Sequence, residues 1–129
     1  MEQPYHHTLF NHYCYGPADL LQIRKGDSTM WLSLRDSGGR AAQAIYYGCI
    51  YWRLDREYIH LSLVQKVTAQ ELMAHSDSVT MRELQKNATD VPSLLKEWEQ
   101  QGLSFFLHQG TEPEDEFLVV AESMEFKRI

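Results

Sequence analysis

The sequence predicts a single α+β domain with a mainly antiparallel β-sheet of about five to six strands and two or three helices inserted between strands four and five. Short alternating segments separated by turn residues fill the first half of the chain, which is typical of strands. Two capping-box patterns then indicate helices, and two strand-like segments follow them. With 129 residues, the chain has the length of one compact domain, which we place at 1–129.

An N-terminal segment and four strands are expected before the helices. Residues 1–17 are rich in aromatic side chains and histidine and end at the break Gly16-Pro17, so we expect them to pack loosely against the domain. Strands are predicted at 19–25, 29–35, 41–54 and 57–64. The third of these is apolar on both faces, which predicts a central strand covered on both sides. Gly48 within it indicates a bulge or the close approach of another backbone.

Two or three helices are expected after residue 67, where the hydrophobic period changes. The capping-box pattern occurs at 68–71 and again at 80–83, where a hydroxyl and a carboxylate satisfy free backbone N–H groups. Asp90 is expected to cap a third helix that ends just before Gly102. The last two strands are predicted at 103–108 and 117–128.

Acidic residues are concentrated in the second half of the chain. Residues 1–64 carry six basic and six acidic side chains, whereas residues 65–129 carry six basic and twelve acidic ones. Such a half repels nucleic acids and anionic membranes, which we do not expect as partners, and attracts a basic protein. The simpler interpretation is that the acidity only keeps the protein soluble. The densest acidic group lies in one loop and comprises Glu112, Glu114, Asp115 and Glu116.

One face of the predicted sheet combines aromatic and polar side chains. Two sets of residues form it: Trp31, Ser33 and Arg35 on one strand, and Tyr58, His60 and Ser62 on another. If uncovered, this face would bind a protein or form a dimer, because Trp, Tyr and Arg are frequent interface anchors. The alternative is that the helices cover it. The opposite face, with Met30, Leu32 and Leu34, is purely apolar, so we expect the helices to pack there instead.

Histidines and a cysteine near the N-terminus are weak metal-ligand candidates: His6, His7, His12 and Cys14. Their spacing matches no pattern that positions ligands in advance, so we expect no native metal and no cofactor. Cys49 lies in an apolar run and is interpreted as a small buried hydrophobe. Neither thiol belongs to a CxxC pair, and both suit a reducing compartment.

The sequence contains no nucleophile elbow GxSxG and no phosphate-binding GxxxxGK or GxGxxG loop. We therefore assign no catalytic residue and do not favour an enzyme, although Cys14 or Cys49 with His12, His60 or His108 stays an alternative. The chain shows neither a signal-peptide pattern nor an apolar run of about 20 residues, so we expect a cytoplasmic protein.

Three functional hypotheses follow. The first is a small non-catalytic binding module, of inhibitor, immunity or accessory type, that binds a protein through its acidic half and its aromatic sheet face. The second is a domain that binds a small molecule between sheet and helices, with Tyr47, Tyr51 and Trp52 in the pocket wall. The third is a metal- or thiol-dependent enzyme that uses the N-terminal His and Cys residues. A homodimer is compatible with all three. The binding residues of the first hypothesis are Trp31, Arg35, Tyr58, His60, Glu112, Glu114, Asp115 and Glu116.

Overall fold

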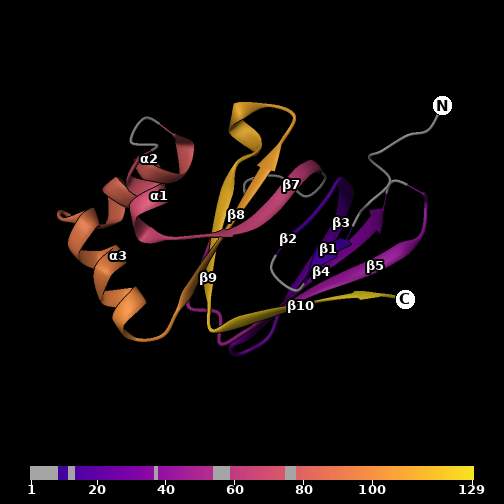
Figure 1. Cartoon of the computed structure of the whole chain (residues 1–129), viewed down its shortest axis with the longest axis horizontal. Helices are drawn as coiled ribbons and strands as arrows, with labels where there is room; N and C mark the ends of the chain where they lie inside the picture. The colour runs from indigo at the N-terminus through magenta and orange to yellow at the C-terminus, as the bar shows by residue number, and fades with distance from the viewer. Residues whose placement is uncertain (1–8, 12–13, 37, 54–58, 75–77) are drawn as a thin grey trace.

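The computed structural model describes residues 9–11, 14–36, 38–53, 59–74 and 78–129. Within them the chain forms ten strands, three α-helices and one 3₁₀ turn (Figure 1). The strands are β1 (Leu9–Asn11), β2 (Cys14–Tyr15), β3 (Ala18–Lys25), β4 (Thr29–Asp36), β5 (Ala41–Tyr47), β6 (Tyr51–Trp52), β7 (Ile59–Val67), β8 (Ser104–Gly110), β9 (Phe117–Ala121) and β10 (Ser123–Arg128). The helices α1 (Ala69–Met73), α2 (Val79–Asn87) and α3 (Val91–Gln100) follow β7, and the turn η2 (Pro113–Asp115) precedes β9.

The predicted α+β class and mainly antiparallel sheet are confirmed, but the number of strands differs. The predicted strand 41–54 divides into β5 and β6, and the predicted strand 117–128 divides into β9 and β10. Two further short strands, β1 and β2, lie within the first seventeen residues. Two of the four extra strands arise because two long segments bend sharply instead of running straight, and the other two are β1 and β2.

The sheet closes on itself. Its strand order is β10-β5-β4-β3-β7-β8-β9-β6, so β10 and β9 lie near opposite ends of the order. Only Glu122 separates these two strands in the chain, and the last strand therefore leaves β8 and crosses to β5. The two bends are held together, because Glu122 N donates to Tyr47 O at 2.8 Å and Ile50 N donates to Val120 O at 2.9 Å. A continuous inner face is thereby enclosed.

Gly48 lies at the bend between β5 and β6. Its φ of +63° is in the left-handed region that favours glycine. A Cβ atom at this position would lie 2.5 Å from the side chain of Glu122. The close approach predicted at Gly48 is therefore present, but the neighbour is the side chain at the other bend.

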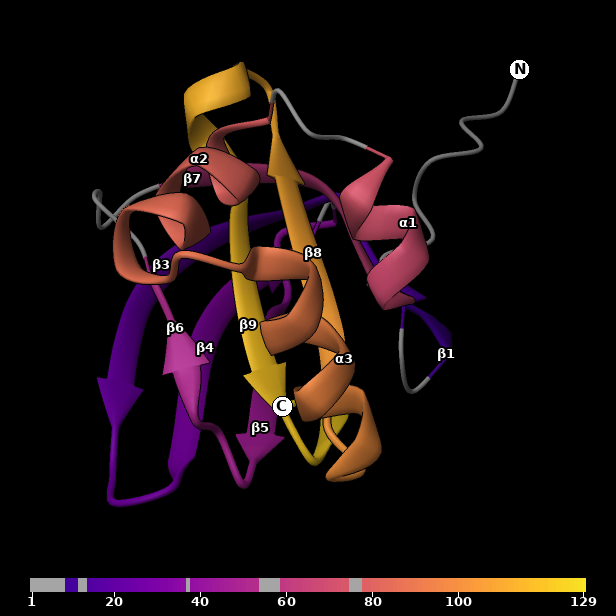
Figure 2. The same cartoon turned by 90° about the vertical axis from the view of Figure 1, so that its left-hand side faces the viewer.

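The closed sheet has one apolar core inside and a second one outside, beneath the helices. The inner core contains the fully buried Tyr15 as well as Met30, Leu32 and Leu34. The second core joins the helices to the outer faces of β8 and β9 through Phe105, Leu107, Leu118 and Val120. Figure 2 shows α2 and α3 in front of these two strands.

The expectation that the helices cover the face with Met30, Leu32 and Leu34 is wrong. Closure of the sheet lets these side chains cover one another and the rest of the inner face. Strands β8 and β9 are apolar on both faces, and their outer faces are left for the helices.

The helix caps agree with two of the three predicted starts. At α1, Thr68 and Glu71 form the predicted capping box, with Glu71 N donating to Thr68 Oγ1 at 3.1 Å. At α3, the side chain of Asp90 accepts from Ser93 N. Helix α2 starts earlier than predicted, because Ser78 is its N-cap and accepts from Met81 N, which places Thr80 in the first turn. None of the helices in the described ranges has the length and apolarity needed to cross a membrane.

Candidate functional site

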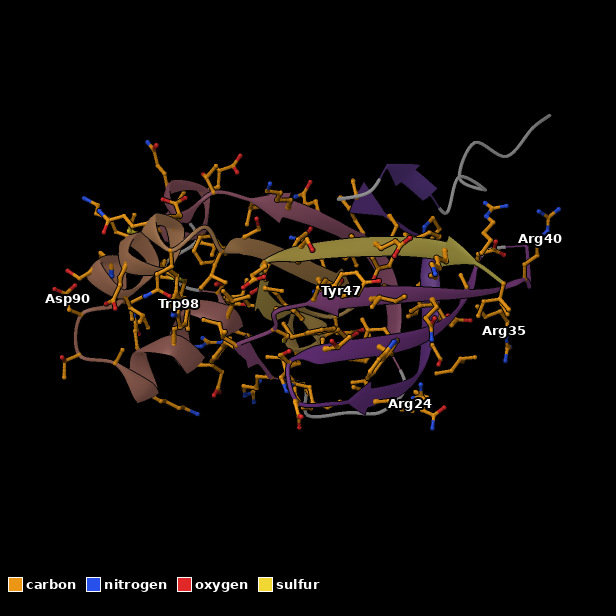
Figure 3. All side chains as sticks on the ribbon, turned by 90° about the horizontal axis from the view of Figure 1, so that it is seen from below. Arg24, Arg35, Arg40, Tyr47, Asp90 and Trp98 are labelled. Carbon is orange, nitrogen blue, oxygen red and sulfur yellow. The ribbon has the colours of Figure 1, made fainter. Side chains whose placement is uncertain are left out.

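The outward side of β3, β4, β5 and β10 is one candidate surface, which we call the open sheet face. Residues paired directly across neighbouring strands point to the same side of a sheet. The pairs Arg24 with Trp31, Trp31 with Ile45, and Ile45 with Glu125 therefore form one row across four strands. A second row contains Gln22, Ser33, Gln43 and Lys127. Seen from below, none of the described helices lies in front of these strands (Figure 3).

The central side chains of the open sheet face are held in place by their neighbours. The Arg24 guanidinium lies 5.3 Å from the centre of the Trp31 ring, a cation–π contact. Tyr47, which is 38% exposed, donates its O–H to Glu125 Oε1 at 2.8 Å. That hydrogen bond to a carboxylate raises the pKa of Tyr47. Ile45, between Trp31 and Glu125, is only 5% exposed.

Trp31 and Arg35 of the predicted binding residues lie on this face. His60 is exposed on β7, and its Nδ1 lies 2.7 Å from Asp19 Oδ1. Because Asp19 pairs with both His60 and Arg35, the structure brings these two predicted residues to either side of one carboxylate. Sequence reasoning did not single out Asp19. Tyr58 lies outside the described residues.

Two of the four carboxylates in the predicted acidic group stabilise the local fold. Asp115 is 4% exposed, and its Oδ2 accepts from Glu112 N at 3.1 Å. Glu116 Oε1 accepts from Thr80 N at 3.2 Å and so links the loop to the first turn of α2. Glu112 and Glu114 are exposed. The outward charge of the loop therefore comes mainly from these two residues.

The net negative charge of the chain comes from one stretch. Residues 68–116 carry ten acidic and three basic side chains, whereas the rest of the chain carries eight acidic and nine basic ones. This stretch contains α1, α2, α3, β8 and η2, and we call the part formed by its helices and η2 the acidic end. In Figure 3, Asp90 of the acidic end lies far from Arg24, Arg35 and Arg40. The structure thus separates the acidic and aromatic surfaces that the first hypothesis combined.

A groove of about 340 Å³ lies between the start of α2 and the loop before β9. Its lining includes Arg82, Gln109, Glu112 and Glu116. The predicted pocket residues do not line it. Tyr47 lies on the open sheet face, Tyr51 packs on Trp98 with ring centres 5.7 Å apart, and Trp52 packs against the inner core.

A polar network crosses the inner core. His108 Nδ1 lies 3.0 Å from Phe106 O, so this nitrogen carries the proton and donates to the carbonyl. The O–H of Tyr46 then donates to His108 Nε2 at 2.7 Å, and the O–H of Tyr15 donates to the oxygen of Tyr46 at 3.3 Å. The ring of His108 also stacks on Phe117, with centres 4.1 Å apart.

The burial of this network keeps it neutral. Burial lowers the pKa of His108 to about 3 and raises the pKa of Tyr46 well above its usual value. Both side chains are fully buried in the inner core, so the geometry indicates a structural role. The network joins residues 62 positions apart in the sequence, and local sequence patterns gave no signal for it.

The thiols do not have the environment of reactive cysteines. Burial raises the pKa of both Cys14 and Cys49, whereas an activated thiol has a lowered pKa. Cys49 is buried as predicted and donates to Tyr51 O at 3.7 Å. Within the described ranges, no three His, Cys, Asp or Glu side chains are grouped so that they could hold a metal ion. The candidates His6, His7 and His12 lie outside those ranges.

Two separate surfaces are therefore candidates for binding: the acidic end and the open sheet face. The first is defined by its charge, and the second by aromatic and basic side chains on an uncovered sheet. Comparison of the chain with protein-family models, with curated proteins and with solved structures returned no match.

Proposed function

We propose that this protein is a non-catalytic binding module, of inhibitor, immunity or accessory type, whose acidic end binds a basic partner protein. The observation that carries the proposal is the confinement of the net charge to residues 68–116, which fold largely into one end of the molecule. A concentrated field of one sign steers a partner of opposite sign and speeds the encounter.

Some carboxylates of the acidic end are explained by the fold itself. Asp90, Glu99 and Glu116 each accept a backbone N–H, which stabilises a helix start. The exposed Glu112 and Glu114 extend the same negative field at the tip of the loop. We expect a basic partner to interact electrostatically with these two residues more strongly than with the rest of the acidic end.

The test compares two double variants that each remove two negative charges. Glu112→Gln with Glu114→Gln changes the acidic end, and Asp27→Asn with Glu122→Gln changes exposed carboxylates elsewhere. Each protein is immobilised and exposed to cell extract in dilute buffer, and the captured proteins are identified by mass spectrometry. We expect a basic protein that the wild type and the control capture, and that the Glu112/Glu114 variant captures at least about 10-fold less.

Salt provides the second readout. The distance over which exposed charges are screened falls from about 10 Å at 0.1 M salt towards about 3 Å at 1 M, so half-molar salt should release the partner. Capture that is equal for both double variants, or that half-molar salt leaves unchanged, would contradict the proposal.

A second candidate function is the binding of a small molecule in the groove beside α2. Its volume of about 340 Å³ falls within the range of ligand pockets, and Arg82 and Glu112 offer both signs of charge. A thermal-shift screen with amino acids and other small zwitterions tests it. A stabilising compound whose effect disappears in Arg82→Ala would support this function, and the absence of any shift would count against it.

A further inference from the structure

We infer that the open sheet face is the contact surface of a symmetric homodimer whose two-fold axis runs parallel to the strands. The inference does not depend on the acidic end and goes beyond the proposed function. It is based on the order of side chains in the rows that cross β3, β4, β5 and β10.

The first row, read from β3 to β10, has side chains that pair favourably with those of the same row read from β10 to β3. It begins with the cation Arg24, continues with Trp31 and Ile45, and ends with the anion Glu125. A two-fold axis along the strands, between β4 and β5, turns the face over and reverses the row. Arg24 then faces Glu125 of the second copy, and Trp31 faces Ile45 of the second copy. Both ends of the row form ion pairs. At both centres the ring of Trp31 covers the second copy's Ile45, of which only 5% is exposed in the single chain.

The second row fits the same operation. Reversed, it places Gln22 opposite Lys127 of the second copy, and Ser33 opposite Gln43 of the second copy. Each of these pairs can form a hydrogen bond, and no like charges meet. An axis perpendicular to the strands and along the first row would instead place Arg24 on Arg24 and Glu125 on Glu125. Electrostatics therefore disfavours that axis, whereas the axis parallel to the strands pairs opposite charges in the first row.

The charged groups of the first row are already oriented in the single chain. The cation–π contact holds Arg24 over Trp31, and the hydrogen bond from Tyr47 fixes one oxygen of Glu125. The second carboxylate oxygen is left for an arginine from across the interface. Such preorganisation reduces the entropy lost on binding. Trp, Tyr and Arg are also the residue types that most often dominate interface energetics.

The dimer should be weak. Four strands about 4.8 Å apart, each contributing about seven residues of 3.3 Å, give an area on the order of 400 Å² per copy. That is about half the area of a standard interface. We therefore expect an association constant that makes the dimer visible only at micromolar or higher concentration.

Sedimentation of the full chain over a concentration series up to about 1 mM tests the proposal. The wild type should dimerise, and Arg24→Glu and Glu125→Arg should each weaken the dimer by about 10-fold or more, because like charges then meet twice. The matched controls are Lys96→Glu and Glu97→Arg, which make the same charge changes on exposed positions of α3. The controls should dimerise like the wild type.

The decisive sample is an equimolar mixture of the two weakened variants. In the mixed dimer, the new carboxylate at position 24 of one chain would face the new guanidinium at position 125 of the other. At the second contact, the unchanged Arg24 would face the unchanged Glu125. The mixture should therefore recover the dimer, whereas a variant that had simply misfolded would not. Thermal unfolding of each variant alone checks its folding.

Three results would overturn the inference: a wild type that stays monomeric at 1 mM, single variants that dimerise normally, or a mixture that fails to recover the dimer. A head-to-tail contact between the open sheet face and the acidic end would be disclosed by loss of dimer in Lys96→Glu or Glu97→Arg. Capture of a basic partner through Glu112 and Glu114 is read in a separate assay. Failure of the dimer therefore leaves the proposed function intact, and the reverse also holds.

Discussion

The two halves of the closed sheet are alike inside and different outside. Strands β8 and β9 carry Phe105, Leu107, Leu118 and Val120 on their outer side, and the helices cover these residues. On the outer side of β4 and β5 the corresponding surface mixes Trp31 and Ile45 with Ser33 and Gln43. Among the described strands, the helices therefore cover the apolar outer side of β8 and β9, and the outer side of β4 and β5 is left for water or a partner.

The inner faces are physically joined across this boundary. Tyr46 on β5 bonds to His108 on β8 at 2.7 Å, so the polar network links the open half to the covered half. Three changes test how far the two halves depend on each other, beginning with the one of largest expected effect.

Acid should lower the free energy of unfolding by protonating His108, which links the two halves through its hydrogen bond with Tyr46. Its pKa is about 3 in the folded chain and near 6.5 when unfolded, so the unfolded chain binds a proton first as the pH falls. The stabilisation is complete above about pH 6.5 and is lost towards pH 3, at up to about 1.4 kcal/mol per pH unit from this group alone. Urea unfolding measured from pH 7 to pH 3.5 should show this slope in the wild type.

The variant His108→Gln isolates that contribution, because all other titrating groups stay the same. The difference in unfolding free energy between wild type and variant should shrink as the pH falls. A difference independent of pH would mean that His108 is not held neutral in the folded chain.

The covered half should be more sensitive to truncation than the open half. Leu118 is 1% exposed beneath the helices, and Leu118→Ala should lower the free energy of unfolding by about 3 kcal/mol. Gln43→Ala, on the outer side of β5, should cost no more than about 0.5 kcal/mol. Equal losses in urea titrations would contradict the contrast between the halves.

The bend that joins the halves should respond less than the covered half. Gly48→Ala forces a side chain into a left-handed conformation and against Glu122, which should cost about 1–2 kcal/mol. Adding Glu122→Ala removes the clash but leaves the backbone strain, so the double variant should regain only part of the loss in urea titrations. Full recovery would show that the conformation of Gly48 carries no strain.

Local signals in the sequence predicted the individual elements but not how the sheet closes. The alternation in 29–35 and the caps at Thr68 and Asp90 depend on neighbours a few residues away, and they agree with the structure. Closure depends on contact between the bend at Gly48 and the bend at Glu122, which lies 74 positions later in the sequence. Nothing in either segment alone indicates the other.

The site was predictable to a similar extent. The outward positions of Trp31 and Arg35 follow from their alternation with buried residues, and the acidic group is visible in the composition. The internal roles of Asp115 and Glu116 were missed, since Glu116 bonds to Thr80 N 36 positions away. The placement of the helices was also missed, although the apolar character of 103–108 on both faces was a readable signal.

Hydrogen–deuterium exchange of the protein alone and bound to the basic partner that it captures is the most direct test of binding through the acidic end. We expect slower exchange on partner binding in the helices and in the loop 110–116, with no change in β4 and β5 at concentrations where the protein is monomeric. Protection confined to β4 and β5, with the acidic end exchanging as in the free protein, would contradict it.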